Sequence, residues 1–295
     1  VKSIGLGGTF QGCTSLKLVQ WNAINCTIDI NSYPPFYNLS SIKNFTFGNN
    51  VKSIPACLCC GLSGLTSITI PDGVTSIGAS AFLGCTSLKA IDIPDSVTSI
   101  GFEAFCGCKS LTSITIPDSV TNIEDRAFYG CDSRTSIVVS EGNTVYDSRD
   151  NCSAIIETTT NTLICACQNT TIPDSVTSIG DFAFCGCKSL TSITIPDSVT
   201  SIGNFAFSSC ESLTSITIPD SVTSIGTFAF RGCKSLTSIT IPDSVTNIGD
   251  GAFYGCDSLT SIVVAEGNTV YDSRDNCNAI IETTTNTLIC ACQNT

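Results

Sequence analysis

Several residue types that catalytic and binding sites commonly use are missing or scarce in this chain. It contains no histidine, which excludes Ser-His-Asp and Cys-His nucleophiles and histidine-ligated metals. It has 13 basic residues against 25 acidic ones, and this net charge of −12 argues against nucleic-acid binding, which requires clustered Lys and Arg. No apolar run approaches the length that spans a membrane. The chain also lacks methionine and opens at Val1 in mid-repeat, so we expect a piece of a longer protein.

One repeated segment is what the chain has in abundance. It reads VTSIGDFAFCGCKSLTSITIPDS at residues 176–198, and near-copies recur at steps of 23 residues within each run. The copies begin at Val74, Val97, Val120, Val199, Val222 and Val245. A period of this length is typical of solenoids, in which each repeat forms one coil that stacks on the next.

Each repeat combines one strand with tight turns. In LTSITIP, Leu190, Ile193 and Ile195 alternate with Ser192 and Thr194, which is the pattern of a half-buried strand. The proline that follows has no N–H and ends the strand, the Asp-Ser after it favours a turn, and the glycine of VTSIG is expected to allow an unusual backbone angle. A short helical or irregular turn, AF-x-x-C, completes the coil.

Burial favours stacking of these coils, because an isolated coil buries too few apolar side chains to offset its loss of conformational entropy. Stacking predicts parallel strands about 4.8 Å apart and ladders of identical residues along the core. The phenylalanine ladder is predicted to contain Phe82, Phe105, Phe128, Phe184, Phe207, Phe230 and Phe253.

Inserts interrupt the repeats at defined places. We predict a single solenoid over residues 1–295, made of a degenerate repeat (1–17), an insert (18–50) with a strand near 44–47, repeats (51–140), a second insert (141–173), repeats (174–265) and another copy of that insert (266–295). The last two inserts match at all but one position over 30 residues, so a larger period of 125 residues is superimposed on the short one.

The pattern L-x-x-I-x-I-P-x-x-V-x-x-I-G-x-x-A-F-x-x-C resembles the repeat of BspA-like leucine-rich repeat proteins, which are surface proteins of bacteria and protists. The insert YDSRDNCNAIIETTTNTLI and the early segment with PFYN and FTFGNNVKSIPA look like accessory segments of the same family. The resemblance covers essentially the whole chain. It implies a right-handed solenoid with one parallel sheet face and short turns opposite, and a surface role in adhesion or partner recognition. It carries over no catalytic residue, and the chain departs from the pattern in its Cys-x-Cys pairs, at Arg134 where Leu is usual and at Glu124 where Gly is usual.

The outward positions of the strands form a lattice of hydroxyl side chains. We call this the sheet-face lattice; its members are Ser67, Thr69, Asp92, Ser113, Thr115, Ser192, Thr194, Ser215, Thr217, Ser238 and Thr240. One interpretation is a solvated surface with good strand propensity. Another is a binding surface for a protein or glycan, since solenoids commonly recognise partners on such faces. A third is ice binding, which a thermal-hysteresis assay tests.

The Asp that follows each proline has a structural interpretation and a functional one. Turn formation is the first. Calcium bridging is the second, but the repeat offers no varied set of oxygen ligands around these carboxylates, and we expect no metal there.

The twenty cysteines also admit more than one interpretation. Seven hold a fixed place in the repeat and are expected to be small apolar core fillers. The Cys-x-Cys pairs do not have the spacing of common zinc sites, so no metal centre is predicted. If each insert forms a hairpin in which Ile155 faces Ile164, then Cys152 faces Cys167 and Cys277 faces Cys292, and we hypothesise these two disulfides.

The sequence therefore predicts a non-enzymatic, extracellular or cell-surface module that needs no cofactor and binds a protein or glycan, including extracellular-matrix components. The alternative from another class is a structural spacer or stalk that projects a different domain, and the third is an enzyme or metal protein built on the inserts.

Overall fold

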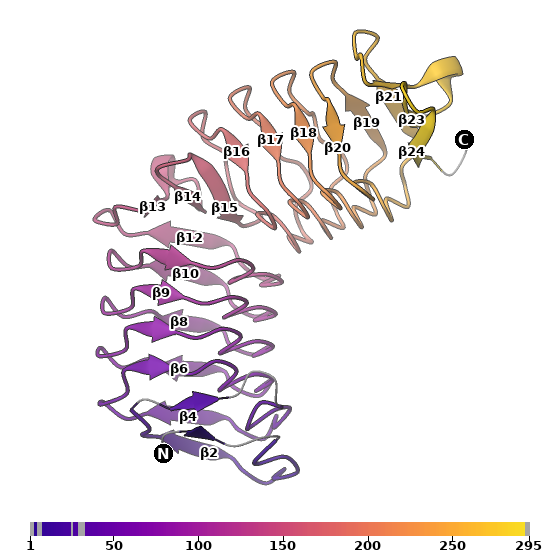
Figure 1. Ribbon diagram of the computed structural model, residues 1–295. Helices are drawn as coiled ribbons and strands as arrows, with labels where there is room; N and C mark the ends of the chain where they lie inside the picture. The colour runs from indigo at the N-terminus through magenta and orange to yellow at the C-terminus, as the bar shows by residue number, and fades with distance from the viewer. Residues whose placement is uncertain (1–2, 5–7, 25, 29–32, 293–295) are drawn as a thin grey trace. The chain divides into compact units, whose positions relative to one another are not determined.

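The computed structural model describes residues 3–4, 8–24, 26–28 and 33–292 (Figure 1). The chain divides into two compact units, unit 1 (Val1–Asp147) and unit 2 (Ser148–Thr295), and the boundary falls inside the predicted insert 141–173. Within each unit, parallel strands from successive repeats pair with a shift of 23 residues, as Ser53 with Ser76 and Ser201 with Ser224. The predicted β-solenoid is thereby confirmed.

Unit 1 carries two columns of strands. The first column consists of the parallel pairs β2–β4, β6–β8 and β10–β12, from β2 (Leu18–Trp21), β4 (Asn44–Phe47), β6 (Ser67–Thr69), β8 (Ala90–Asp92), β10 (Ser113–Ile116) and β12 (Ser136–Val139). All but β2, which lies in the predicted insert 18–50, are at predicted strand positions. The second column is a four-stranded parallel ladder of β5 (Ser53–Ile54), β7 (Ser76–Ile77), β9 (Ser99–Ile100) and β11 (Asn122–Ile123). The remaining strands are β1 (Ser3–Ile4), β3 (Thr27–Ile28) and β13 (Tyr146–Asp147).

Unit 2 repeats this plan and adds two hairpins. Its second column is β16 (Ser178–Ile179), β17 (Ser201–Ile202), β18 (Ser224–Ile225) and β20 (Asn247–Ile248), and β19 (Ser238–Ile241) pairs with β21 (Ser261–Val264). The inserts form antiparallel hairpins, β14 (Ala154–Glu157) with β15 (Thr162–Ala166) and β23 (Ala279–Glu282) with β24 (Thr287–Ala291). Each hairpin is preceded by a three-residue 3₁₀ helix, η1 (Arg149–Asn151) or η2 (Arg274–Asn276), and β22 (Tyr271–Asp272) pairs with β23.

The sequence analysis placed one strand in each repeat, and the structure differs in two respects. The short VTSIG segments form their own ladders, which are longer than those of the predicted strands. Conversely, residues 192–195 and 215–218 keep the alternating burial but are not strands, because a single backbone bond, from Thr214 N–H to the Thr191 carbonyl at 3.0 Å, joins these coils there.

The core consists of stacked identical side chains, as the repeat predicts. The rings of Phe184 and Phe207 lie 4.9 Å apart, and those of Phe207 and Phe230 lie 5.3 Å apart and parallel. In unit 1 the Phe82 and Phe105 rings stack at 5.3 Å. All five rings are fully buried. The coil-to-coil contact of these rings, which bury large apolar areas, holds each solenoid together.

The turns and the glycines of VTSIG lie where successive coils approach each other closely. The proline turn is closed by the Val199 N–H, which donates to the Pro196 carbonyl at 3.0 Å. The glycine was predicted to supply an unusual backbone angle, and this reason is wrong, because a Cβ on Gly226 would lie 2.5 Å from the Asn204 backbone nitrogen. Close approach of the preceding coil requires glycine here. The left-handed angle falls two residues later, at Phe228 with φ 54°.

The two departures from the repeat in unit 1 do not interrupt it. The buried Arg134, which replaces a leucine, donates from Nη1 to the Phe128 carbonyl at 3.0 Å. The carboxylate of Glu124 accepts the Phe102 N–H at 2.8 Å. Both polar groups satisfy backbone groups, so the coil keeps its register.

Candidate functional site

All eleven members of the sheet-face lattice are exposed, while the isoleucines between them are buried or largely buried. In β6 and β10, for example, Ile68 and Ile114 point into the core of unit 1 and their neighbours point outward. Each face includes an exposed apolar residue beside an insert, Val138 in unit 1 and Val263 in unit 2, and both are 48% exposed. In unit 1, Leu18 of β2 and Ala90 of β8 are also exposed at outward positions. Each unit therefore presents a hydroxyl-rich surface that includes a few exposed apolar side chains.

Hydroxyl groups outside the lattice have a structural role that sequence patterns did not reveal. Thr214 Oγ1 donates to the Thr191 carbonyl of the preceding coil at 3.2 Å, and Thr200 Oγ1 donates to the Thr177 carbonyl at 3.2 Å. Ser198 Oγ donates to the Val176 carbonyl at 2.6 Å. Equivalent bonds recur along both units. These hydroxyls tie one coil to the next.

The lattice hydroxyls, by contrast, make no hydrogen bond to any part of the chain that the structure describes. A hydroxyl group donates one hydrogen bond and accepts up to two, so each lattice position retains its full capacity for water or a partner. Exposure and this capacity separate the lattice from the other Ser and Thr columns.

The face of unit 1 contains a groove beside its lattice residues. A groove of about 290 Å³ runs between β4 and β6, and Asn44, Thr46, Ser67 and Thr69 are among its lining residues. The sequence analysis singled out the two β6 residues but not the two from β4, which lies in the predicted insert 18–50. The placement of β4 beside β6 brings these two residues to the groove, and Thr46 Oγ1 also donates to the Val19 carbonyl at 3.4 Å.

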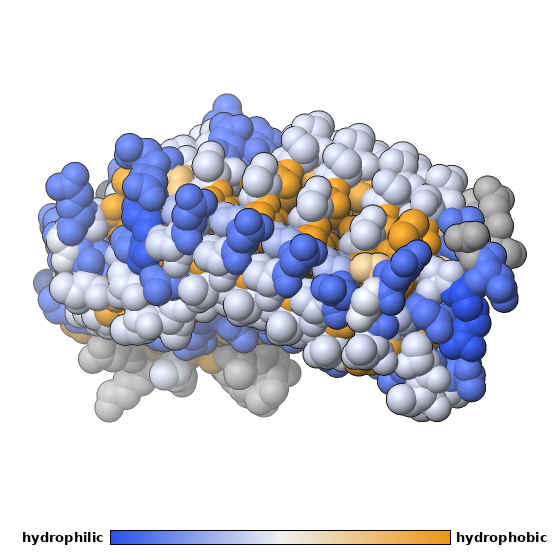
Figure 2. Space-filling view, turned by 90° about the horizontal axis from the view of Figure 1, so that it is seen from above, coloured by the Kyte–Doolittle hydropathy of each residue, from blue (hydrophilic) through white to orange (hydrophobic). Residues whose placement is uncertain are grey.

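The charges that border the face of unit 2 differ between its two edges. At the start of each strand position, Lys188, Glu211, Lys234 and Asp257 alternate in sign, and Lys234 Nζ lies 3.2 Å from Glu211 Oε2. At the other edge stands the carboxylate column, Asp174, Asp197, Asp220 and Asp243, whose side chains are all exposed. Within the described chain none of these four has a hydrogen bond or an ion pair. Figure 2 shows hydrophilic side chains recurring at regular intervals along one side of the molecule.

The seven cysteines of the repeat are buried, and they are also hydrogen-bond donors. Cys233 Sγ donates to the Phe207 carbonyl at 3.2 Å, and Cys108 Sγ donates to the Phe82 carbonyl at 3.3 Å. Burial raises the pKa of the Cys85 thiol to about 12. Burial also raises the pKa of Cys108 and Cys210, and because the thiolate is the reactive form, these three thiols are structural and inert. Cys256 differs, because the hydrogen bond from the Cys233 thiol lowers its pKa.

The hairpins differ from the predicted pairing by one residue. Ile155 pairs with Cys165 and Ile156 with Leu163, with a β-bulge between the two pairs, so the predicted pairing of Ile155 with Ile164 is wrong. A bulge adds a residue on one strand, and sequence spacing alone does not reveal it. Cys167 Sγ donates to the Ser153 carbonyl at 3.5 Å.

All twenty cysteines, each among the described residues, are thiols in the structure. The hypothesised disulfides Cys152–Cys167 and Cys277–Cys292 are not formed in it, and their formation in the oxidised protein stays a prediction.

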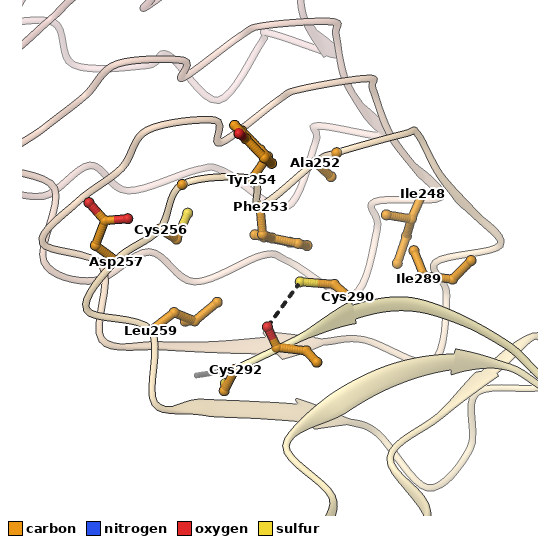
Figure 3. A pocket seen from close by; sticks show the side chains of 13 residues that line it. Ile248, Ala252, Phe253, Tyr254, Cys256, Asp257, Leu259, Ile289, Cys290 and Cys292 are labelled. Atoms are coloured by element: carbon orange, nitrogen blue, oxygen red, sulfur yellow. Dashed lines mark hydrogen bonds between the residues drawn. The ribbon is translucent and has the colours of Figure 1, made fainter. Parts of the chain in front are cut away.

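A pocket of about 320 Å³ lies in unit 2 between the coil of Phe253 and strand β24 (Figure 3). Cys256, Cys290 and Cys292 line it, and Cys290 Sγ donates weakly to the Ala291 carbonyl at 4.0 Å. Burial raises the pKa of Cys290 to about 11, and the nearby Cys256 and Cys292 add to this rise. The thiol is therefore protonated at neutral pH and is a weak nucleophile. Among the described residues, no group of three or more Cys, Asp or Glu side chains is arranged to hold a metal ion.

Within the part of the chain that the structure describes, no helix has the length and apolar character needed to cross a membrane.

Comparison with known proteins adds a family and a set of structural neighbours. The model of the BspA type leucine-rich repeat region matches residues 1–89, 57–161 and 154–278. A leucine-rich cell surface protein of Faecalibacterium prausnitzii is 32% identical with a TM-score of 0.70, over 91% of this chain and 78% of that one. No curated protein matches the chain.

Two further solved structures share the fold at lower identity. The pneumococcal vaccine antigen PcpA is 20% identical with a TM-score of 0.72, over 89% of this chain and 75% of that one. A leucine-rich repeat protein of Eubacterium ventriosum is 24% identical with a TM-score of 0.62, over 85% and 73% of the two chains.

Proposed function

Because the chain belongs to the family of BspA-type leucine-rich repeat proteins, we propose that it is a surface module that recognises a protein partner through the sheet faces of its solenoid units. The observation that supports this most directly is the contrast between hydroxyl columns. Thr200 and Thr214 bond to the backbone of the coil before them, whereas the lattice residues keep their hydrogen-bonding capacity while standing on an exposed surface. A location outside the cell or at its surface is consistent with the cell-surface neighbour.

Several features support recognition rather than catalysis. The chain has no histidine, and the Cys290 thiol in the pocket of Figure 3 has a raised pKa. The lattice, in contrast, offers donors and acceptors in register over successive coils, together with the exposed Val263. A non-obligate protein interface is about as polar as the rest of the protein surface, so a hydroxyl-rich face with an exposed apolar residue is compatible with one.

Solid-phase binding of the full chain to a panel of immobilised extracellular-matrix proteins tests the proposal. The variant Ser215→Gln/Ser238→Gln replaces two small lattice residues with longer neutral side chains, and we expect it to lose binding. The matched control, Thr159→Gln/Thr284→Gln, changes two exposed residues at the tips of the hairpins and should bind as the parent does. Equal binding by both variants and the parent, or no binding by the parent to any protein of the panel, would contradict recognition by the lattice.

The alternative function, a spacer, draws on a different observation. Coils in one register with stacked rings, such as Phe184 on Phe207, allow a whole repeat to be removed without changing the remaining contacts. Deletion of residues 199–221 should leave a spacer functional at a slightly shorter reach. If cell adhesion by the parent protein is unaffected by this deletion and by the lattice variant, the spacer function is supported instead.

A further inference from the structure

The charged residues around the sheet face of unit 2 indicate which charge its partner carries. An inference about this charge rests on the proposed function. Its lattice positions, Ser192, Thr194, Ser215, Thr217, Ser238 and Thr240, are all uncharged. The electrostatic character of the face is therefore set by its two borders. These borders flank the lattice positions along the sequence of each repeat.

The two borders differ in how their charges are ordered from coil to coil. On the first border Lys188, Glu211, Lys234 and Asp257 alternate in sign from coil to coil, and Lys234 forms an ion pair with Glu211 at 3.2 Å. On the second border the carboxylate column places like charges in successive coils, an arrangement that is destabilising in itself. The charges of the first border thus balance one another, whereas the negative charge of the carboxylate column is not balanced by neighbouring side chains of the column.

Turn formation does not explain the carboxylates. The turn after the strand position is closed by the Val199 N–H bond to the Pro196 carbonyl, and Ser198 Oγ anchors it to the Val176 carbonyl. The carboxylate of Asp197 makes no hydrogen bond to the described chain. The polar side chain that holds the turn is therefore the serine. An amide in place of the carboxylate leaves each of these bonds intact.

We infer that the sheet face of unit 2 docks a basic surface of a polypeptide partner. The lattice hydroxyls hydrogen-bond to the peptide groups and polar side chains of that surface, Val263 packs against an apolar side chain, and Lys and Arg residues pair with the carboxylate column. Charge complementarity of this kind selects partners and speeds their association. The same column repels anionic partners such as sulfated glycans.

Two charge-matched variants of the full chain test this inference. The border variant is Asp197→Asn/Asp220→Asn/Asp243→Asn. The control variant, Asp181→Asn/Asp250→Asn/Glu266→Gln, removes the same amount of charge from exposed positions of unit 2 outside the face. Circular dichroism and thermal unfolding establish that both variants fold as the parent does.

The probes are a fluorescent oligolysine peptide, an oligoglutamate peptide of equal length and heparin. We expect the parent and the control to bind oligolysine with similar affinity, and the border variant to bind it about tenfold more weakly, because each exposed ion pair contributes a factor of roughly 1.5 to 5. The border variant should also show a smaller loss of affinity with added salt. Oligoglutamate and heparin should not bind.

The possible results separate this inference from the proposed function. Equal weakening in both variants means that oligolysine senses net charge alone, and unchanged binding in the border variant means that the column has no part; either result overturns the inference. Suppose that the Ser215→Gln/Ser238→Gln variant no longer binds a matrix protein that the border variant still binds. The lattice then binds its partner without the carboxylate column, and only the basic-partner inference fails. If the lattice variant retains that protein too, the proposed function fails as well.

Discussion

Replacement of one stacked ring should show whether the phenylalanine ladder holds unit 2 together. Phe207 is fully buried, and its ring lies 4.9 Å from that of Phe184 and 5.3 Å from that of Phe230. Phe→Ala in a core costs about 3–5 kcal/mol, which includes the cavity that remains. Loss of two stacked partners places Phe207→Ala in the upper part of this range, at about 4–5 kcal/mol of unfolding free energy.

The chain offers a matched control two residues away. Phe205 also contacts neighbouring rings, stacked on Phe182 at 5.0 Å and tilted against Phe228 at 5.2 Å, but it is only partly buried and its φ is 55°. Gly251 occupies the same place in the last coil. Phe205→Gly loses the ring contacts but relieves a left-handed backbone angle that costs a bulky residue about 1–2 kcal/mol. We therefore expect a net loss well below that of Phe207→Ala.

Urea unfolding measured by circular dichroism, combined with hydrogen exchange of peptides from residues 199–221, gives the loss of unfolding free energy for each of the two variants. The exchange measurement is needed because solenoids lose stability locally, by contacts between neighbouring coils. We expect faster exchange in this coil and its two neighbours for Phe207→Ala, and little change for Phe205→Gly. Equal destabilisation by the two variants, or a loss below about 1 kcal/mol for Phe207→Ala, would refute the view that the buried ladder carries the stacking energy.

Three further predictions follow from the contacts described. Gly226→Ala should destabilise unit 2 by about 2 kcal/mol or more in urea unfolding, because its Cβ would meet the Asn204 backbone nitrogen at 2.5 Å; an unchanged midpoint would contradict the close approach. Burial raises the pKa of Cys60 and Cys85 from 9.0 to about 12, so the folded state binds these protons more tightly than the unfolded state. The contribution of these thiols to the free energy of unfolding should therefore be constant below pH 9 and fall between pH 9 and 12, as measured by alkaline unfolding. A free energy of unfolding that does not change over this range would be inconsistent with buried thiols. Lys234→Glu should lower the melting temperature slightly at low salt and leave it unchanged at high salt, since it turns an alternating border into like charges.

The sequence alone was sufficient to predict the solenoid architecture, because the 23-residue repeat is visible in it. Identical residues every 23 positions bury themselves only by stacking, so the ring ladder through Phe184 and Phe207 and the outward position of Ser215 follow from periodicity and burial alone. The hairpins of the inserts were also predictable from their apolar segments, although the bulge at Ile155 and Ile156 was not. A bulge depends on how the two strands twist against each other, which the sequence does not display.

What only the tertiary structure decided is which polar groups are already engaged. In the sequence Thr214 and Ser215 are neighbours of the same chemical kind, yet the first donates to the Thr191 carbonyl and the second has no partner in the described chain. The same is true of Ser198, which anchors its turn, and Asp197, which does not. The reason is physical: a hydrogen bond from a side chain depends on where the carbonyl of the preceding coil lies, and that position exists only once the coils are stacked.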